Sequence, residues 1–184
     1  MSAKIAEPGV IEKLSIGCST TVGEPIGPRS ERVVRFVEAF HAAGIPDVVA
    51  TDDAAQALWE KFMFLAPCAS ANSATGLPTG PLRALPEGLD MVMAMQREIR
   101  AVGLASGVNL PDEVAERVRT LYLNLSEGHT VSMQRDFEAG RRVELESLTG
   151  TVVRRGRQAG VPTPVFDTAY AILRTRALQY GGVS

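Results

Sequence analysis

Residues 53–66 read Asp-Ala-Ala-Gln-Ala-Leu-Trp-Glu-Lys-Phe-Met-Phe-Leu-Ala, and this apolar stretch begins the largest part of the fold. Its large apolar side chains recur at helical spacing, and Asp52 or Asp53 is a suitable N-cap, so the stretch predicts a long apolar helix. Pro67 lacks the amide hydrogen that a helix interior needs, and we expect it to interrupt or kink this helix. The breaker-rich loop 76–81 then ends it.

The pattern beyond this helix stays helical to the end of the chain. Prolines and acidic residues near first turns, and glycines beyond last turns, predict further helices at 86–106, 111–126, 143–158 and 164–179. A polar stretch, 126–142, separates the second of these from the third. Residues 53–184 are therefore expected to form an all-helical domain.

The first 52 residues follow a different pattern. Residues 14–22 and 47–51 are rich in β-favouring side chains and predict short strands. Between them, Ser30 is a suitable N-cap for an amphipathic helix, and Gly44 sits where a C-cap belongs. One strand–helix–strand unit is typical of the end of a parallel sheet. The expected fold is mainly α, with residues 1–52 as the remnant of an α/β domain.

The composition excludes several classes of protein. Hydrophobic residues make up 45% and charged residues 22%, and the net charge of −2 offers no basic surface for nucleic acid. No apolar run approaches the ~20 residues of a membrane-spanning helix, and the amino terminus lacks the apolar core of a signal peptide. Cys18 and Cys68 form no disulfide framework, which favours a reducing, cytoplasmic location. With His41 and His129 they provide no spaced metal-ligand cluster.

Four stretches of the sequence follow one another in a characteristic order and spacing. They are Leu58-Trp59-Glu60-Lys61-Phe62; Gly80; Ser132-Met133-Gln134-Arg135-Asp136 with Gly140-Arg141, Glu144 and Gly150; and Gly160-Val161-Pro162-Thr163-Pro164. Together they resemble the ketopantoate reductase (2-dehydropantoate 2-reductase) family over nearly the whole chain. The resemblance implies an amino-terminal Rossmann domain that binds NADPH and a helical domain of the 6-phosphogluconate dehydrogenase C-terminal type. The implied reaction reduces 2-dehydropantoate to pantoate, a step toward pantothenate.

The resemblance implies roles for three of these residues. The lysine that matches Lys61 is the acid at the substrate carbonyl, the glutamate that matches Glu144 assists it, and the serine that matches Ser132 hydrogen-bonds the substrate. An ammonium near a carbonyl being reduced stabilises the negative charge on its oxygen. Taken alone, Lys61 fits an exposed helix residue better than an acid, whereas Glu144 also fits a first-turn acid and Ser132 an N-cap.

Two further charged groups have a structural interpretation. Asp136 with Arg141 or Arg142 predicts a structural ion pair rather than a substrate contact. The cluster of Arg154, Arg155 and Arg157 is interpreted as the solvated face of a helix. Neither group is expected to be part of the substrate site.

The helix of Lys61 departs from the family pattern. The family commonly has asparagines four and eight residues after this lysine, where this chain has Leu65 and Ala69. Thr79 stands where a further family asparagine precedes the glycine, and Asn72, close to the same helix face, is the candidate substitute for substrate binding. Because hydrogen-bonding groups are replaced by apolar ones, we expect a less hydroxylated 2-oxo acid or another small ketone as substrate.

A second departure concerns the cofactor. The 184 residues contain no Gly-x-Gly-x-x-Gly turn, so the residues that would bind the cofactor are not identified. We therefore expect an incomplete reductase: a truncated product, a misplaced start, or one chain of a split enzyme with a separate nucleotide-binding partner. The alternative is a non-catalytic helical module for dimerisation or interaction. Large exposed apolar area on residues 1–55 would favour the reductase, and a well-covered surface the module.

Overall fold

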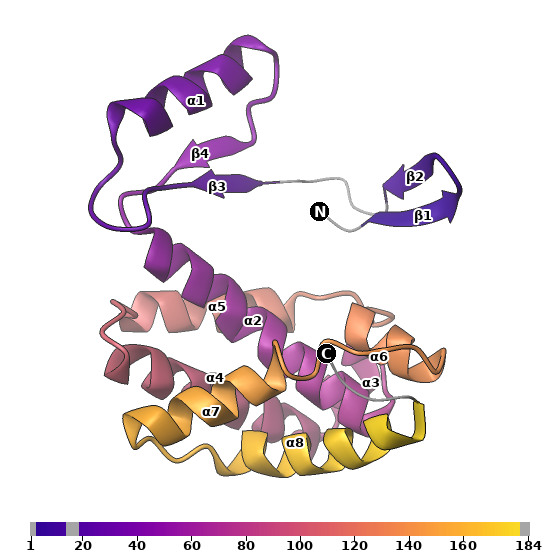
Figure 1. The fold of residues 1–184 in the computed structure, drawn as a ribbon. Coiled ribbons are helices and arrows are strands. Elements are labelled where there is room, and N and C mark those ends of the chain that lie inside the picture. The colour runs from indigo at the N-terminus through magenta and orange to yellow at the C-terminus, as the bar shows by residue number, and fades with distance from the viewer. Residues whose placement is uncertain (1–2, 14–18, 181–184) are drawn as a thin grey trace. The chain divides into compact units, whose positions relative to one another are not determined.

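An α/β segment gives way to helices alone near residue 57. A computed structural model describes residues 3–13 and 19–180. In it the chain forms two compact units, Met1–Ala57 and Leu58–Ser184 (Figure 1). Among the described helices, none is both long and apolar enough to cross a membrane. The mainly helical fold expected from the sequence is confirmed.

The first unit contains the expected strand–helix–strand element. Strand β3 (Thr20–Val22) pairs in parallel with β4 (Val48–Ala50), and helix α1 (Glu31–Ala42) connects them (Figure 1). Residues 14–18, including Cys18, belong to the first expected strand but lie outside the described residues. A parallel pair needs a crossover of this kind because its two strands run in the same direction.

A hairpin precedes this element, and the sequence patterns did not reveal it. Strands β1 (Ala3–Glu7) and β2 (Val10–Lys13) pair antiparallel. Gly9 makes the turn with a φ of +85°, a conformation that glycine adopts without steric cost. The expected N-cap, Ser30, stands in the correct position but makes no side-chain bond to the helix; its hydroxyl donates to the Glu24 carboxylate instead.

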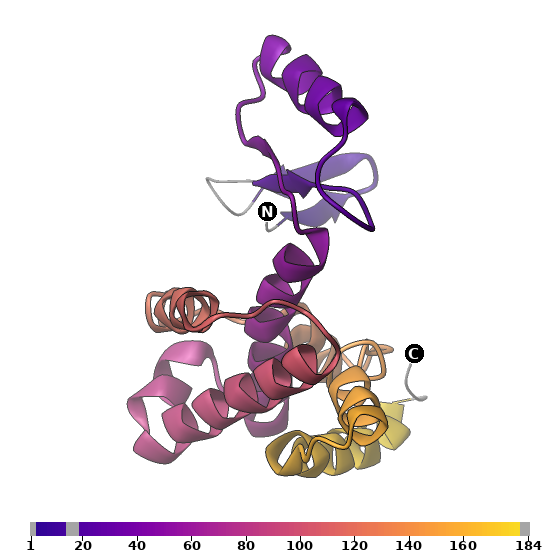
Figure 2. The same cartoon turned by 90° about the vertical axis from the view of Figure 1, so that its left-hand side faces the viewer.

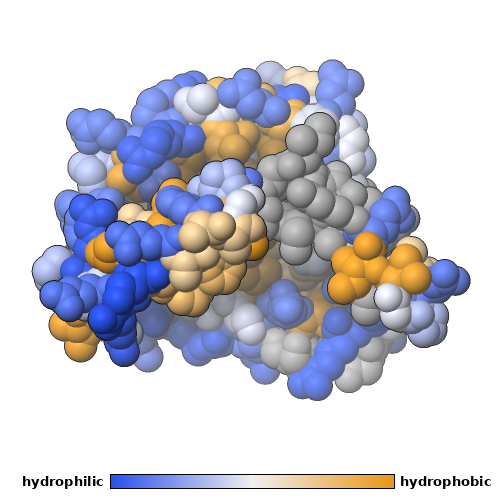
Figure 3. All heavy atoms as spheres, turned by 90° about the horizontal axis from the view of Figure 1, so that it is seen from above, coloured by the Kyte–Doolittle hydropathy of each residue, from blue (hydrophilic) through white to orange (hydrophobic). Residues whose placement is uncertain are grey.

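Helix α1 covers one face of the parallel strand pair. Val33 and Val37 of α1 and Val48 of β4 are buried, whereas Val49, whose side chain alternates to the opposite face, is 45% exposed. The large apolar side chains exposed in this unit are Val10, Ile11, Ile26, Val34, Phe36, Ile45 and Val49. Hydrophobic atoms reach the surface among hydrophilic ones on the face shown in Figure 3. Parallel sheets usually bury both faces, so this much exposed apolar area is unusual.

Helices make up the second unit between residues 58 and 180, with turns and loops between them. Its elements are α2 (Ala54–Thr75, from Leu58 onward), α3 (Thr79–Ala84), α4 (Pro86–Ala105), α5 (Asp112–Leu123), α6 (Ser132–Glu138), α7 (Thr149–Ala159), α8 (Pro164–Ala177) and a 3₁₀ turn (Leu178–Tyr180). Helix α4 lies against α3, α5, α7 and α8, and α7 lies against α8 (Figures 1 and 2). Helices α2 and α7 carry most of the candidate site.

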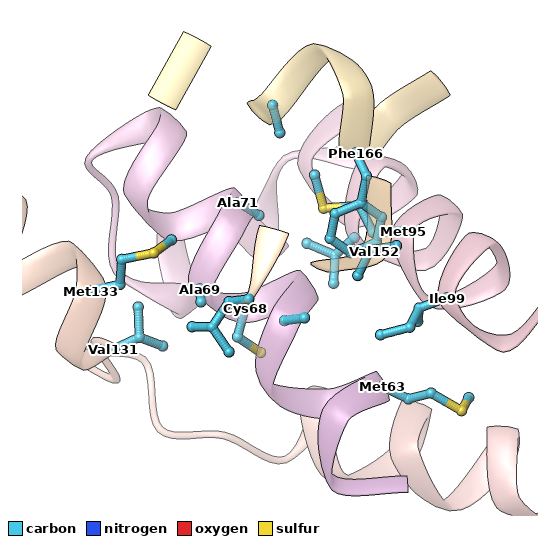
Figure 4. Packing of buried hydrophobic residues seen from close by; sticks show 14 of the residues in the cluster. Met63, Cys68, Ala69, Ala71, Met95, Ile99, Val131, Met133, Val152 and Phe166 are labelled. Atoms are coloured by element: carbon cyan, nitrogen blue, oxygen red, sulfur yellow. The ribbon is translucent and has the colours of Figure 1, made fainter. Parts of the chain in front are cut away.

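Helix α2 enters the core of this unit. Its residues 66–73 are all buried and mostly small, which lets neighbouring helices approach closely. Figure 4 shows Met63, Cys68 and Ala69 of α2 among the apolar side chains of the same core, which also include Met95 and Phe166. A helix that is apolar on all sides is typical of a core position.

The expected interruption at Pro67 is wrong, because α2 continues through it from Ala54 to Thr75. A proline in a helix interior costs about 3 kcal/mol through a lost hydrogen bond and a steric clash. Here Pro67 lies in the buried stretch, and the apolar contacts around it hold the helical path. The helix ends as expected at the loop that starts with Gly76, whose φ is +70°.

The expected helix at 143–158 begins later than its apolar pattern predicts. Helix α7 starts at Thr149, although Val143, Leu145 and Leu148 are already buried before it. The hydroxyl of Thr151 and the guanidinium of Arg154 both donate to the backbone oxygen of Glu146. Side chains therefore provide hydrogen-bond donors for this backbone oxygen, and the segment adopts a conformation that is not helical.

Candidate functional site

A pocket opens between α2 and α7 of the helical unit. Helical spacing brings Leu58, Lys61, Phe62 and Leu65 onto one face of α2. The lining residues are Leu58, Trp59, Lys61, Phe62 and Leu65 from α2, with Ser147, Thr151 and Arg155 from α7 and the turn before it. The cavity volume is about 380 Å³, within the range of small-molecule sites.

The charged groups that line this pocket are both cations. Neither Lys61 nor Arg155 forms an ion pair with any carboxylate in the described part of the chain. The guanidinium carbon of Arg155 lies 5.7 Å from the centroid of the Trp59 ring, within the range of a cation–π contact. Trp59 in turn meets Phe62 edge to face, with ring centroids 5.8 Å apart. The pocket thus combines positive charge with aromatic and aliphatic walls.

The two arginines beside Arg155 have partners elsewhere. Arg154 pairs with Glu146, and Arg157 lies 3.2 Å from a carboxylate oxygen of Asp167. All three arginines are exposed, as the interpretation of a solvated helix face expects. That interpretation missed the pocket position of Arg155.

Lys61 is the one expected site residue that lines this pocket. Glu144 is exposed and lies three residues before Ser147, and Ser132 is exposed at the first residue of α6. Neither is among the lining residues. The roles given to Glu144 and Ser132 stay predictions.

Asn72 is fully buried, at the end of α2. Its amide nitrogen donates to the Leu77 oxygen at 3.0 Å and to the Thr79 hydroxyl at 3.2 Å, which ties α2 to the start of α3. These bonds are structural, and a substrate role for Asn72 stays a prediction. Leu65 lines the pocket, while Ala69 is buried in the core.

Local electrostatics hold the turn that leads into α7. The hydroxyl of Tyr170 donates to the Glu146 carboxylate at 2.6 Å, and this bond, together with Arg154, lowers the pKa of Glu146. The same bond raises the pKa of Tyr170. A Cβ on Gly150 would lie 2.7 Å from a Glu146 carboxylate oxygen and 2.8 Å from the Arg154 guanidinium, and both are ends of flexible side chains that can shift.

The Asp136–Arg141 ion pair expected from the sequence is confirmed, with 2.7 Å between the guanidinium and the carboxylate. It lies on α6 and in the turn beyond it. No metal site accompanies these charges: among residues 3–13 and 19–180, no group of three or more His, Cys, Asp or Glu could hold an ion. Cys68 is a free, buried thiol, and its burial raises its pKa to about 12.

The loop after β3 does not fit the phosphates of a dinucleotide. A Cβ on Gly23 would lie 2.7 Å from the Thr51 methyl, so this glycine serves a close approach within the protein. The hollow beside it is lined by the carboxylates of Glu24, Asp52 and Asp53, and the nearby cations Arg32 and Arg29 are already paired with Glu24 and Asp52. Carboxylates repel phosphate, and phosphate sites instead use backbone amides and positive charge.

Comparison with known proteins assigns the chain to a protein family. The family described as "Ketopantoate reductase PanE/ApbA C terminal" matches residues 53–177. The chain therefore belongs to the ketopantoate reductase family, as its motifs predicted.

Similar proteins support this assignment. The chain is 31% identical to a 2-dehydropantoate 2-reductase of Halobacterium salinarum over 168 residues, which cover 91% of this chain and 54% of that protein. It is 30% identical to the Mesorhizobium japonicum enzyme of that name, covering 98% and 54%. The crystal structure of 2-dehydropantoate 2-reductase from Methylococcus capsulatus superposes with a TM-score of 0.83 at 31% identity, covering 97% of this chain and 56% of that one. The chain spans about half the length of the curated relatives it matches.

Proposed function

We propose that this chain is the substrate-binding part of an NADPH-dependent reductase that converts a 2-oxo acid, such as 2-dehydropantoate, into the 2-hydroxy acid. The observation that carries the proposal is the position of Lys61. Its side chain lines a small, mainly apolar pocket, and it forms no ion pair with a carboxylate among the described residues. Family membership and the named activity of the relatives support the same reaction.

Lys61 supplies the acid for this reaction. Reduction of a ketone builds negative charge on the carbonyl oxygen, and an ammonium aimed at that oxygen stabilises the charge and donates the proton. The apolar side chains of Leu58, Phe62 and Leu65 lie beside Lys61 in the pocket and would contact the rest of the substrate. Solvent then returns a proton to Lys61, whose pocket is open to it.

Glu144 and Ser132 are proposed as assisting groups. Both are exposed and so remain available to a ligand. A carboxylate at Glu144 would orient the lysine ammonium and accept a hydrogen bond from a substrate hydroxyl, and the Ser132 hydroxyl would bond the substrate. Asn72 would bind the substrate only if its amide released its hydrogen bonds to Leu77 and Thr79.

The hydride donor would be held by other residues. The glycines and carboxylates after β3 do not suit a pyrophosphate, so a nucleotide site would come from a longer version of the chain, from a second copy, or from a separate nucleotide-binding chain. The exposed apolar side chains of the first unit favour such a partner over a free-standing interaction module. The buried free thiol of Cys68 suits a reducing, cytoplasmic setting.

Calorimetric titration of the purified chain with 2-dehydropantoate and with 4-methyl-2-oxopentanoate tests the role of Lys61. Lys61→Met is expected to weaken binding of the tighter acid at least tenfold, or about 1.4 kcal/mol, because the pocket loses its ammonium. Arg119→Met, on α5 of the same unit and outside the pocket lining, is the matched control and should bind as the natural chain does. Equal affinities in the natural chain and Lys61→Met would refute the assignment.

A further inference from the structure

We infer that Arg155 holds the substrate carboxylate and that the pocket selects a 2-oxo acid with an apolar side chain over a hydroxylated one. This inference rests on the proposed function of the same pocket. It assigns each of the two cations a different part of the ligand. Lys61 addresses the carbonyl oxygen, and Arg155 addresses the carboxylate beside it.

The charge of the pocket carries the first step. Its lining contains two cations and no acid, and the Arg155 guanidinium has no carboxylate partner among the described residues. Its neighbours Arg154 and Arg157 are occupied by Glu146 and Asp167. A guanidinium without a carboxylate partner is a suitable binding group for an anion, because charge-assisted hydrogen bonds to a carboxylate are stronger than neutral ones. A small carboxylate would neutralise this charge.

The chemistry of guanidinium distinguishes the two cations. Arginine presents a planar fork of N–H groups that matches both oxygens of a carboxylate, whereas a lysine ammonium is a point charge suited to a single oxygen. The Arg155 guanidinium carbon lies 5.7 Å from the centroid of the Trp59 ring, and this contact helps to keep the guanidinium at the pocket. A 2-oxo acid places its carboxylate next to its carbonyl, so one ligand satisfies both cations.

The walls of the pocket determine the rest of the ligand. Leu58, Trp59, Phe62 and Leu65 contribute no hydrogen-bonding group to a ligand side chain except the indole N–H. A substrate hydroxyl placed against these walls would lose its bonds to water without replacement. Ser147 and Thr151 offer hydroxyls on the α7 side, but the Thr151 hydroxyl already donates to the Glu146 oxygen. An aliphatic or aromatic substituent therefore fits better than the hydroxymethyl group of 2-dehydropantoate.

Tryptophan fluorescence gives a direct test, because Trp59 is the only tryptophan in the chain and lines the pocket. The natural chain, Arg155→Gln and Arg155→Lys are titrated with 4-methyl-2-oxopentanoate, with its primary amide and with 2-dehydropantoate. Arg157→Gln removes an exposed arginine of the same helix outside the pocket and is the matched control. The dissociation constant, not the amplitude, is compared, since Arg155 touches the fluorophore.

The expected results separate this inference from the proposed function. Arg155→Gln should weaken binding of the apolar acid at least tenfold, Arg155→Lys by less, and Arg157→Gln less than twofold. The amide should bind the natural chain and Arg155→Gln equally, and 2-dehydropantoate should bind the natural chain less tightly than the apolar acid. If Lys61→Met weakens binding of the acid and Arg155→Gln does not, the Arg155 assignment alone is overturned. Tighter binding of 2-dehydropantoate would overturn the apolar preference, and no binding of either acid would overturn both proposals.

Discussion

Replacing Gly80 by alanine is expected to destabilise the helical unit, although alanine is the better helix former. A Cβ at this position would lie 2.5 Å from the Glu127 Cα and 2.7 Å from the Glu127 oxygen. Both are backbone atoms, which cannot turn away as the end of a flexible side chain can. The substitution must therefore displace the segment around Glu127 from the start of α3.

The loss of stability can be estimated from the hydrogen bonds that this displacement would lengthen. The Gly80 and Thr79 amides donate to the Glu127 and His129 oxygens, each at 2.9 Å, and both bonds lengthen if the segment moves. Overpacking costs about 1–3 kcal/mol, and a weakened hydrogen bond adds about 1 kcal/mol. The higher helix propensity of alanine offsets up to about 1 kcal/mol of this loss. The net loss is about 2 kcal/mol, which corresponds to a decrease in Tm of about 4–8 °C for a chain of this length.

Thermal unfolding followed by circular dichroism measures this loss. Gly128→Ala is the matched control, since a Cβ there meets nothing within 4 Å and its φ is not in the left-handed region. Its Tm should stay within about 2 °C of the natural chain. A Gly80→Ala variant as stable as Gly128→Ala would refute the close approach of α3 to the segment around Glu127.

Two charge-assisted contacts give further predictions. Glu98→Ala removes the acceptors for the Val165 and Phe166 amides, at 2.9 and 3.0 Å, so urea unfolding should show about 1–2 kcal/mol less stability, and an unchanged midpoint would contradict it. Bonds from Arg32 and Ser30 lower the pKa of Glu24 from 4.5 to about 2. This depressed pKa stabilises the fold above pH 4.5, and the stabilisation is lost as the pH falls toward 2. Arg32→Ala should move the carboxyl titration of Glu24, followed by NMR, back toward 4.5; an unmoved titration would count against the pair.

Local patterns predicted the helices that have strong end signals. Pro86 and Pro164 each occupy the first helical residue, as expected, and Gly160 ends α7 in the left-handed conformation. The failures occurred where longer-range contacts decide the backbone. Pro67 stays helical because it is buried, and the apolar residues from Val143 onward form a turn because Arg154 and Thr151 bind the Glu146 oxygen.

The site could be predicted only in part for a similar reason. Lys61 was identified from a family motif, and its helix was recognised from its apolar spacing. Ser147 and Arg155 carry no local signal, because their place in the pocket depends on how α7 packs against α2. Ser147 lies in the turn before α7, so its place in the pocket does not follow from the spacing of that helix.

The most direct test of the account follows a lysine resonance during titration with a 2-oxo acid. The chain has only three lysines, Lys4, Lys13 and Lys61, so ¹³C-labelled lysine gives three side-chain signals. The Lys61 signal, assigned by its loss in Lys61→Arg, should shift saturably with the dissociation constant found by calorimetry, and the other two should stay in place. Saturable binding that leaves the Lys61 signal unmoved would contradict the assignment of this pocket as the substrate site.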